Sequence, residues 1–183
     1  MEVFFIKNQQ RVGAARVPAV LAALSAIGII LGKFLAFNIT ESMRFSLENM
    51  PLILAGMAFG PWAGALVGAV ADIVGCLMVG YTINPLVTLG AATIGLISGL
   101  VPSLLRKAKL KGWLVTALTV ALAHVIGSII IKTAGLAAYY TIPFGILILW
   151  RLLNYLIVGV LDGIIVHILL NNKGVKLQIL RLK

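Results

Sequence analysis

Charged residues are scarce in this sequence of 183 residues: Asp, Glu, Lys and Arg make up 11% of the chain, and only five residues are acidic. A soluble domain of this length needs a polar surface that so few charges cannot supply. Hydrophobic residues make up 61%, with a mean hydropathy of +1.11. The apolar runs are continuous and do not alternate with period two, which excludes a membrane β-barrel. We expect one all-α integral membrane domain covering residues 1–183.

Residues that usually carry catalysis or bind metals are also scarce. The chain has one cysteine, Cys76, and two histidines, so it can form no internal disulfide and holds no Cys/His zinc cluster. No Ser-His-Asp set, HExxH motif or paired carboxylates in an aqueous site can be placed. The run GIILGK at 28–33 is one residue short of a phosphate loop and lies in an apolar segment. We expect no enzyme, no metal site and no cofactor in this chain.

Six apolar segments are predicted to form transmembrane helices. They cover about 17–37, 46–59, 61–80, 84–105, 113–138 and 144–170. The second segment is short, because spanning a ~30 Å hydrocarbon layer takes about 20 helical residues. We therefore expect it to be tilted, continued into the preceding loop, or shielded by its neighbours.

Basic residues, which give a net charge of +10, lie in three groups between or beyond the apolar segments. These groups fall at 7–16, 106–111 and 173–183. Loops rich in Lys and Arg normally face the cytoplasm, and six spans place both termini on one side. The pattern thus predicts cytoplasmic N- and C-termini. The same distribution argues against nucleic-acid binding, for which charge alone is weak evidence.

Small residues recur every fourth position in two neighbouring segments. Gly64, Gly68 and Asp72 share one helical face, and Ala91, Gly95 and Gly99 share another. Such stripes let helices approach closely in lipid. Because Asp72 continues a small-residue stripe, we expect its carboxylate to face another helix and to have a partner there.

Polar residues also form faces on the last two segments. His124, Ser128 and Lys132 share one face of the fifth, and Arg151, Asn154, Val158 and Asp162 share one face of the sixth. The connections predicted to lie outside are hydrogen-bonding and aromatic, and they contain Asn38, Thr40, Arg44, Tyr81, Asn84, Tyr139, Tyr140 and Pro143. These groups could converge on a polar chamber that reaches from the outer surface to mid-membrane. The alternatives are internal salt bridges that set helix register, and tyrosines that serve as interfacial anchors.

Four alanines form a smooth strip on the first segment: Ala19, Ala22, Ala23 and Ala26. Their offsets of 0, 3, 4 and 7 place them on one helical face. The strip suits close packing inside the bundle, and it suits docking on a separate membrane subunit equally well.

The run RFSLENMPLILAGMAFGPWAGALVGAVADIVG at 44–75, followed by NPLVTLGAATIGLISG at 84–99, resembles the folate-specific substrate-binding subunits (S components) of energy-coupling factor (ECF) transporters. The resemblance covers nearly the whole chain and implies a six-helix bundle in the bacterial cytoplasmic membrane. It also implies a vitamin bound near the outer face, a transmembrane coupling subunit, and two cytoplasmic ATPase subunits that use ATP. The alanine strip resembles the motif by which these subunits meet the coupling subunit.

On this resemblance, the candidate substrate-binding residues are Arg44, Glu48, Asn49, Asp72, Asn84, Lys132, Tyr139, Tyr140, Arg151 and Asn154. Arg44, Lys132 or Arg151 would bind the two carboxylates of the folate glutamate, since charge-assisted hydrogen bonds to carboxylates are strong. Asp72, Glu48 or Asn49 would accept from the N–H donors of the pterin, and Tyr139, Tyr140 or Phe144 would cover it.

Other functions stay open at this point. An S component for riboflavin or thiamine would share the fold, because fold does not select the ligand. A self-sufficient secondary transporter should show repeated halves with broken helices, and we detect no clear repeat. A purely structural membrane subunit fits poorly with polar residues gathered at the outer side.

Overall fold

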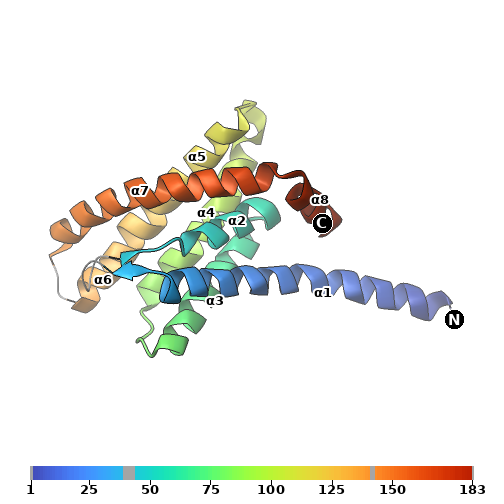
Figure 1. Cartoon of the computed structure of the whole chain (residues 1–183), viewed down its shortest axis with the longest axis horizontal. Coiled ribbons are helices and arrows are strands. Elements are labelled where there is room, and N and C mark those ends of the chain that lie inside the picture. Colours follow the sequence, from blue (N-terminus) through green and yellow to red (C-terminus); the bar gives the residue numbers. More distant parts are fainter. Residues whose placement is uncertain (1, 39–43, 141–142, 183) are drawn as a thin grey trace.

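In the computed structural model, which describes residues 2–38, 44–140 and 143–182, the chain is a bundle of helices (Figure 1). Of the residues within this range, 2–15, 38, 44, 140 and 146 are described by their backbone only. Helices dominate because a backbone within a bilayer must satisfy its own hydrogen bonds. Five helical segments are long and apolar enough to span a membrane, and one shorter apolar helix accompanies them. The all-α prediction is confirmed.

The first half of the chain forms one long helix, a short hairpin and two more helices. Helix α1 (Glu2–Ile29) continues into the π-helical segment η1 (Ile30–Phe34), so this helix begins well before residue 17. Strands β1 (Phe37–Asn38) and β2 (Arg44–Phe45) pair antiparallel and lead to α2 (Asn49–Phe59) and α3 (Pro61–Val79). The short α2 is largely buried, as expected for a segment shielded by its neighbours.

The second half begins with α4 (Pro85–Leu105), which a 3₁₀ turn, η2 (Arg106–Ala108), connects to the next helix. The fifth predicted span is one helical segment in three parts: α5 (Gly112–Ala123), the π-helical η3 (His124–Lys132) and α6 (Thr133–Tyr140). The last span is α7 (Phe144–Asn171). The basic C-terminal tail forms a further helix, α8 (Lys173–Leu182), which we did not predict.

The boundaries follow local sequence signals. Proline at the first helical position begins α3 and α4, because its missing N–H has no intrahelical partner there. Gly60 (φ 103°) and Gly80 (φ 72°) end α2 and α3 in backbone conformations that other residues rarely adopt. Asn84 caps α4, accepting from the backbone N–H groups of Leu86 (3.0 Å) and Val87 (3.4 Å).

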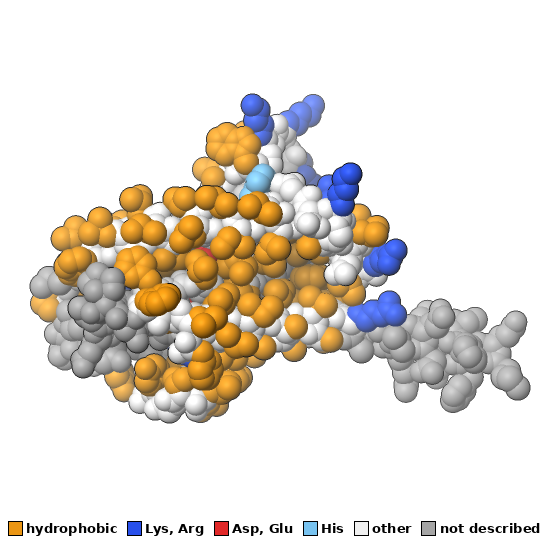
Figure 2. All heavy atoms as spheres, viewed as in Figure 1, with side chains coloured by type: hydrophobic (Ala, Val, Ile, Leu, Met, Phe, Trp, Pro, Cys, Tyr) orange, Lys and Arg blue, Asp and Glu red, His pale blue; other side chains and the backbone are white. Residues whose placement is uncertain are grey.

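Helix α4 lies at the centre of the bundle and contacts α2, α3, α5, η3 and α6. Both described ends of the chain and the α4–α5 turn lie away from the β1–β2 hairpin, which lies at the opposite end of the molecule, where β2 contacts α7 (Figure 1). We call these the basic end and the hairpin end. Exposed Lys and Arg side chains gather at the basic end (Figure 2). This end contains Arg16, Arg106, Lys107, Lys109, Lys111, Lys173, Lys176 and Arg181.

Candidate functional site

A small cavity with charged walls lies near the hairpin end, where η1, α2, α3, α4 and η3 meet. It is lined by Gly28, Lys33, Glu48, Leu52, Gly68, Ala71, Asp72, Ala91 and Lys132. Its volume of about 20 Å³ holds roughly one water molecule. Of the residues on the two predicted polar faces, only Lys132 lines this cavity. A vitamin could enter only if these side chains moved apart.

Lys132 is the buried cation of this cavity. Its Nζ donates to Glu48 Oε1 at 2.9 Å and to Asn49 Oδ1 at 3.4 Å. The Lys132 side chain is 5% exposed and that of Glu48 is 27% exposed. A buried ammonium group requires an anion and hydrogen-bond acceptors, and here loop and helix residues 83 and 84 positions away supply them.

Asp72 is held by a different partner in the same cavity. The hydroxyl of Thr88 donates to Asp72 Oδ2 at 2.6 Å and links α4 to α3. This confirms that the carboxylate faces a neighbouring helix. Just beyond, the Asn84 amide donates to the Gly135 carbonyl at 2.9 Å, so Asn84 connects α4 to α6 as well as capping α4.

Lys33 is a second cation at the cavity, and we did not predict it as a binding residue. Its Nζ lies 3.7 Å from Cys76 Sγ and 5.9 Å from the centre of the Tyr81 ring. A lysine within an apolar span is itself a signal of function, because charge in a membrane is costly.

Glycines make room for the charged side chains. Gly32 does so for Glu48, Gly90 for Lys132 and Gly75 for Lys33. A methyl group on these glycines would lie 2.8 Å from Glu48 Oε2, 2.6 Å from Lys132 Cγ and 2.9 Å from Lys33 Cε. The cavity is therefore built from small residues on three helical segments that admit long polar side chains.

A second group of polar side chains meets between η3 and α7. His124 Nε2 lies 3.1 Å from Asp162 Oδ2, and the His124 ring stacks on Tyr155 with centroids 4.8 Å apart. Arg151 Nη1 donates to the Ser128 carbonyl at 2.9 Å. The two predicted polar faces thus face each other, and Arg151 binds the backbone of η3 instead of lining the charged cavity.

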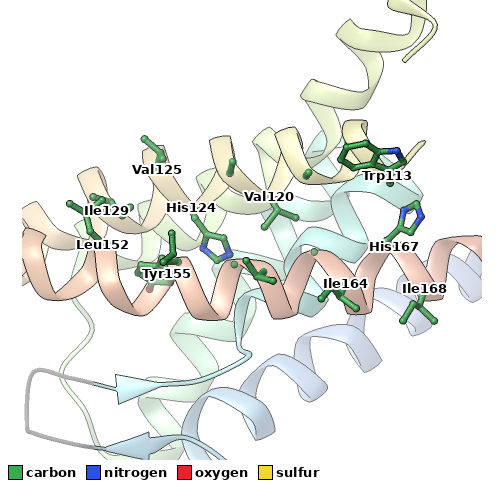
Figure 3. Close-up of a pocket in the computed structure, with 16 residues that line it drawn as sticks. Trp113, Val120, His124, Val125, Ile129, Leu152, Tyr155, Ile164, His167 and Ile168 are labelled. Atoms are coloured by element: carbon green, nitrogen blue, oxygen red, sulfur yellow. The ribbon is translucent and has the colours of Figure 1, made fainter. Parts of the chain in front are cut away.

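A larger groove of about 570 Å³ runs between α5–η3 and α7 (Figure 3). Trp113 and His167 stand at one end of it, and Ile129 and Leu152 at the other (Figure 3). Its walls are apolar apart from a few ring groups such as His124 and Tyr155. The groove has volume but few polar groups, whereas the charged cavity has polar groups but little volume.

The structure brings together four of the predicted binding residues: Glu48, Asn49, Asp72 and Lys132. Tyr139 is 52% exposed at the end of α6, and Asn154 is half-buried on α7. The side chains of Arg44 and Tyr140 lie outside the described residues, so their roles stay predictions. Among the described residues, no group of three or more His, Cys, Asp or Glu could hold a metal ion.

The alanine strip lies on the open surface of α1. Ala19, Ala22, Ala23 and Ala26 are all exposed, so the strip does not pack inside the described bundle. This excludes close packing of the strip within the described bundle, and docking on a separate membrane subunit stays a prediction.

Comparison with known proteins gives one family and several similar folds. The family model described as "ECF-type riboflavin transporter, S component" matches residues 15–176. No curated protein sequence matches the chain.

Solved structures resemble the chain over most of its length. The crystal structure of FolT bound with folic acid is 28% identical, with a TM-score of 0.66, over 81% of this chain and 89% of that one. The S component for biotin is 20% identical, with a TM-score of 0.69, over 93% and 97%. ThiT from Listeria monocytogenes is 21% identical, with a TM-score of 0.62, over 88% and 96%. The last two similarities show the fold.

Proposed function

Since this chain belongs to the family of ECF-type riboflavin transporter S components, we propose that it is the vitamin-binding membrane subunit of such a transporter and that its vitamin is folate. Membership of the family makes the chain a transporter subunit. It leaves the vitamin open, because similar structures include S components for different vitamins. The choice of folate as the vitamin is therefore a separate, more specific proposal.

The observation that supports folate as the vitamin is the buried Lys132 in a charged cavity at the hairpin end. Folate has two carboxylates on its glutamate, and a desolvated ammonium group binds a carboxylate strongly. Riboflavin carries no carboxylate. The similarity to FolT, whose structure contains folic acid, supports the same choice at 28% identity.

The residues divide into two proposed roles. Lys132, with Arg44 or Arg151, would bind the glutamate carboxylates, and Asp72, Glu48 or Asn49 would accept from the pterin. Asn84 and Asn154 would stand at the margins of the site, and Tyr139, Tyr140 or Phe144 would cover the ring. The chain itself would need no cofactor, because the partner ATPase subunits use the ATP.

We place the protein in the bacterial cytoplasmic membrane with both termini in the cytoplasm. All the exposed basic residues of the α4–α5 turn and of α8 lie at the basic end, far from the hairpin end (Figure 2). The positive-inside rule then directs the hairpin end, and with it the charged cavity, toward the outside.

The exposed alanine strip on α1 would dock on the transmembrane coupling subunit. Small residues allow close helix approach in lipid. Replacing Ala22 and Ala23 with tryptophan should abolish co-purification with the coupling subunit while vitamin binding by the isolated chain persists. Loss of neither, or of both, would contradict a docking role separate from ligand binding.

The assignment of folate is tested by extracting the protein in detergent without added ligand and identifying any co-purified vitamin by absorbance and mass. A binding panel of folate, riboflavin, thiamine and biotin then ranks the affinities. Tightest binding of folate supports the proposal. Tightest binding of riboflavin, which the description of the family model names, would replace it with a riboflavin S component. Transport by the purified chain in vesicles without ATPases would instead indicate a secondary transporter.

A further inference from the structure

We propose that Glu48 is an internal competitor for the vitamin: its carboxylate occupies the binding position at Lys132, and a carboxylate of the ligand must displace it. The inference deepens the proposed function, and the part of it that concerns folate rests on that function. It assigns Glu48 a role opposite to direct ligand contact, since removing its charge should strengthen binding.

The two partners of the ion pair differ in their freedom to move. The Lys132 side chain is 5% exposed and lies in η3 against Gly90, with Asn49 as a second acceptor. The Glu48 side chain is 27% exposed, and its backbone lies in a turn just before α2, outside any helix. Lys132 is therefore the stationary cation, and Glu48 is the partner able to withdraw.

The space that Glu48 occupies is also the space a ligand would need. The Glu48 side chain lies over Gly32 of η1, so a methyl group there would come within 2.8 Å of both Cβ and Oε2. It lines the same cavity as Asp72 and Lys33, which has a volume of only about 20 Å³. Withdrawal of this one side chain would enlarge the cavity and free a hydrogen-bonding position 2.9 Å from Lys132 Nζ.

Charge balance makes the exchange selective. The cavity is lined by two cations, Lys33 and Lys132, and two carboxylates, Glu48 and Asp72. An unpaired buried charge is strongly unfavourable, so Glu48 should withdraw only when another anion replaces it. A neutral ligand offers no replacement. The pair would then discriminate in favour of acidic vitamins and keep the site closed to neutral ones of similar size.

The test measures folate binding to purified wild type and to Glu48→Gln, which keeps the shape of the side chain and removes its charge. We expect E48Q to bind folate about tenfold more tightly, because the competitor is gone. Lys132→Met should weaken binding by about 100-fold through loss of the cation. Asp72→Asn is the matched control: it removes an equal charge from the same cavity, but from the partner of Thr88, and must not tighten binding.

A second readout needs no vitamin. In E48Q without vitamin, acetate can take the vacated position on Lys132, so sodium acetate should raise the unfolding temperature above that in equimolar sodium chloride. Wild type and the double variant E48Q/K132M should show no such acetate effect. Should E48Q not fold, Glu48→Asp replaces it, because a shorter acid reaches Lys132 less well and should tighten folate binding by a smaller factor.

The outcomes separate the two proposals. A wild type that does not bind folate overturns folate as the vitamin, and the acetate arm then decides the inference by itself. A wild type that binds folate, with E48Q binding it equally or more weakly, overturns the competitor role of Glu48. Equal acetate effects in E48Q and E48Q/K132M overturn it too, since acetate would then act away from Lys132.

Discussion

The α3–α4 and α5–α7 interfaces are both helix contacts in the same bundle, but α3 and α4 pack backbone against backbone, whereas α5 and α7 leave an open groove between them. Between α3 and α4 the backbones lie in close contact at the glycine stripe, where methyl groups at Gly64 or Gly68 would run into the carbonyls of Gly95 or Ala91. Between α5–η3 and α7 there is a groove of about 570 Å³, and one of its lining residues, His124, pairs with the buried Asp162. The first interface combines close backbone contact with the Thr88–Asp72 hydrogen bond, and the second has few polar contacts beside an open groove.

This difference indicates which part of the bundle can rearrange. Two helices in backbone contact over several turns have no side-chain rotamers to adjust, so they move together or not at all. The groove side includes π-helical η3, which carries Lys132, and π-helical segments often mark functional sites. We infer that α3 and α4 form the stationary wall of the charged cavity, that Lys132 is its stationary cation, and that the turn at Glu48 is its adjustable part.

The most damaging single change should be Gly95→Leu. A Cβ there overlaps the Gly64 carbonyl and closely approaches Ala65, so α3 and α4 must separate. We expect a loss of more than about 3 kcal/mol in stability. Detergent size-exclusion and thermal unfolding would show an aggregated or low-melting protein. Gly145→Ala, where no atom lies within 4 Å, is the control and should behave as wild type.

The next largest effect should come from His124→Leu on the groove side. It leaves Asp162, which is fully buried, without its 3.1 Å partner, and breaking a buried pair costs roughly 3–5 kcal/mol. Adding Asp162→Leu should recover much of the lost stability by removing the orphaned charge. Thermal unfolding of the two single variants and the double variant measures the coupling, and simple additivity would contradict an energetic pair.

A smaller loss, about 1–3 kcal/mol, is expected for Gly68→Ala in α3. The added methyl group would overlap the Ala91 carbonyl, which belongs to a helix backbone and cannot rotate away. Unfolding temperature is the measurement. A neutral result would mean that α3 and α4 can separate slightly at little cost, and the description of a stationary wall would be wrong.

The same substitution on the groove side should be almost harmless. At Gly159 a methyl group would lie 3.4 Å from His124 Cδ2, an ordinary contact, and alanine favours a helix over glycine by about 1 kcal/mol. Gly159→Ala should therefore leave the unfolding temperature unchanged or raise it slightly. If Gly159→Ala lowered the unfolding temperature as much as Gly68→Ala, the two interfaces would not differ in packing as described.

Sequence reasoning succeeded where the signal lay within one helix. The four-residue spacing of Gly64, Gly68 and Asp72 places them on one face whatever the rest of the fold does, and the structure packs that face against α4. The inward face containing Asp162 was predicted for the same reason, and the short α2 from the length of its apolar run. Helical periodicity is local, so it can be read without knowing any partner.

It succeeded less where the answer lay in pairing between distant segments. Lys132 and Glu48 are 84 residues apart, and nothing in their neighbouring residues indicates that one neutralises the other. The hydrogen bond from Arg151 to the Ser128 carbonyl joins residues 23 positions apart, and the sequence did not indicate it. The π-helical register of η3 also shifts which side chains face α7, and no sequence pattern that we used predicts a π segment.

The sequence by itself determined the apolar helices, the gathering of the basic residues at one end of the bundle, and the glycine stripes at which α3 and α4 meet. It could do so because hydropathy, charge and helical period are properties of residues close together in the chain. The tertiary structure alone decided that Lys33, Glu48, Asp72 and Lys132 share one cavity of about 20 Å³. Which buried cation meets which acid depends on where five separate helical segments cross, and each charge can be buried only where such a crossing supplies its opposite.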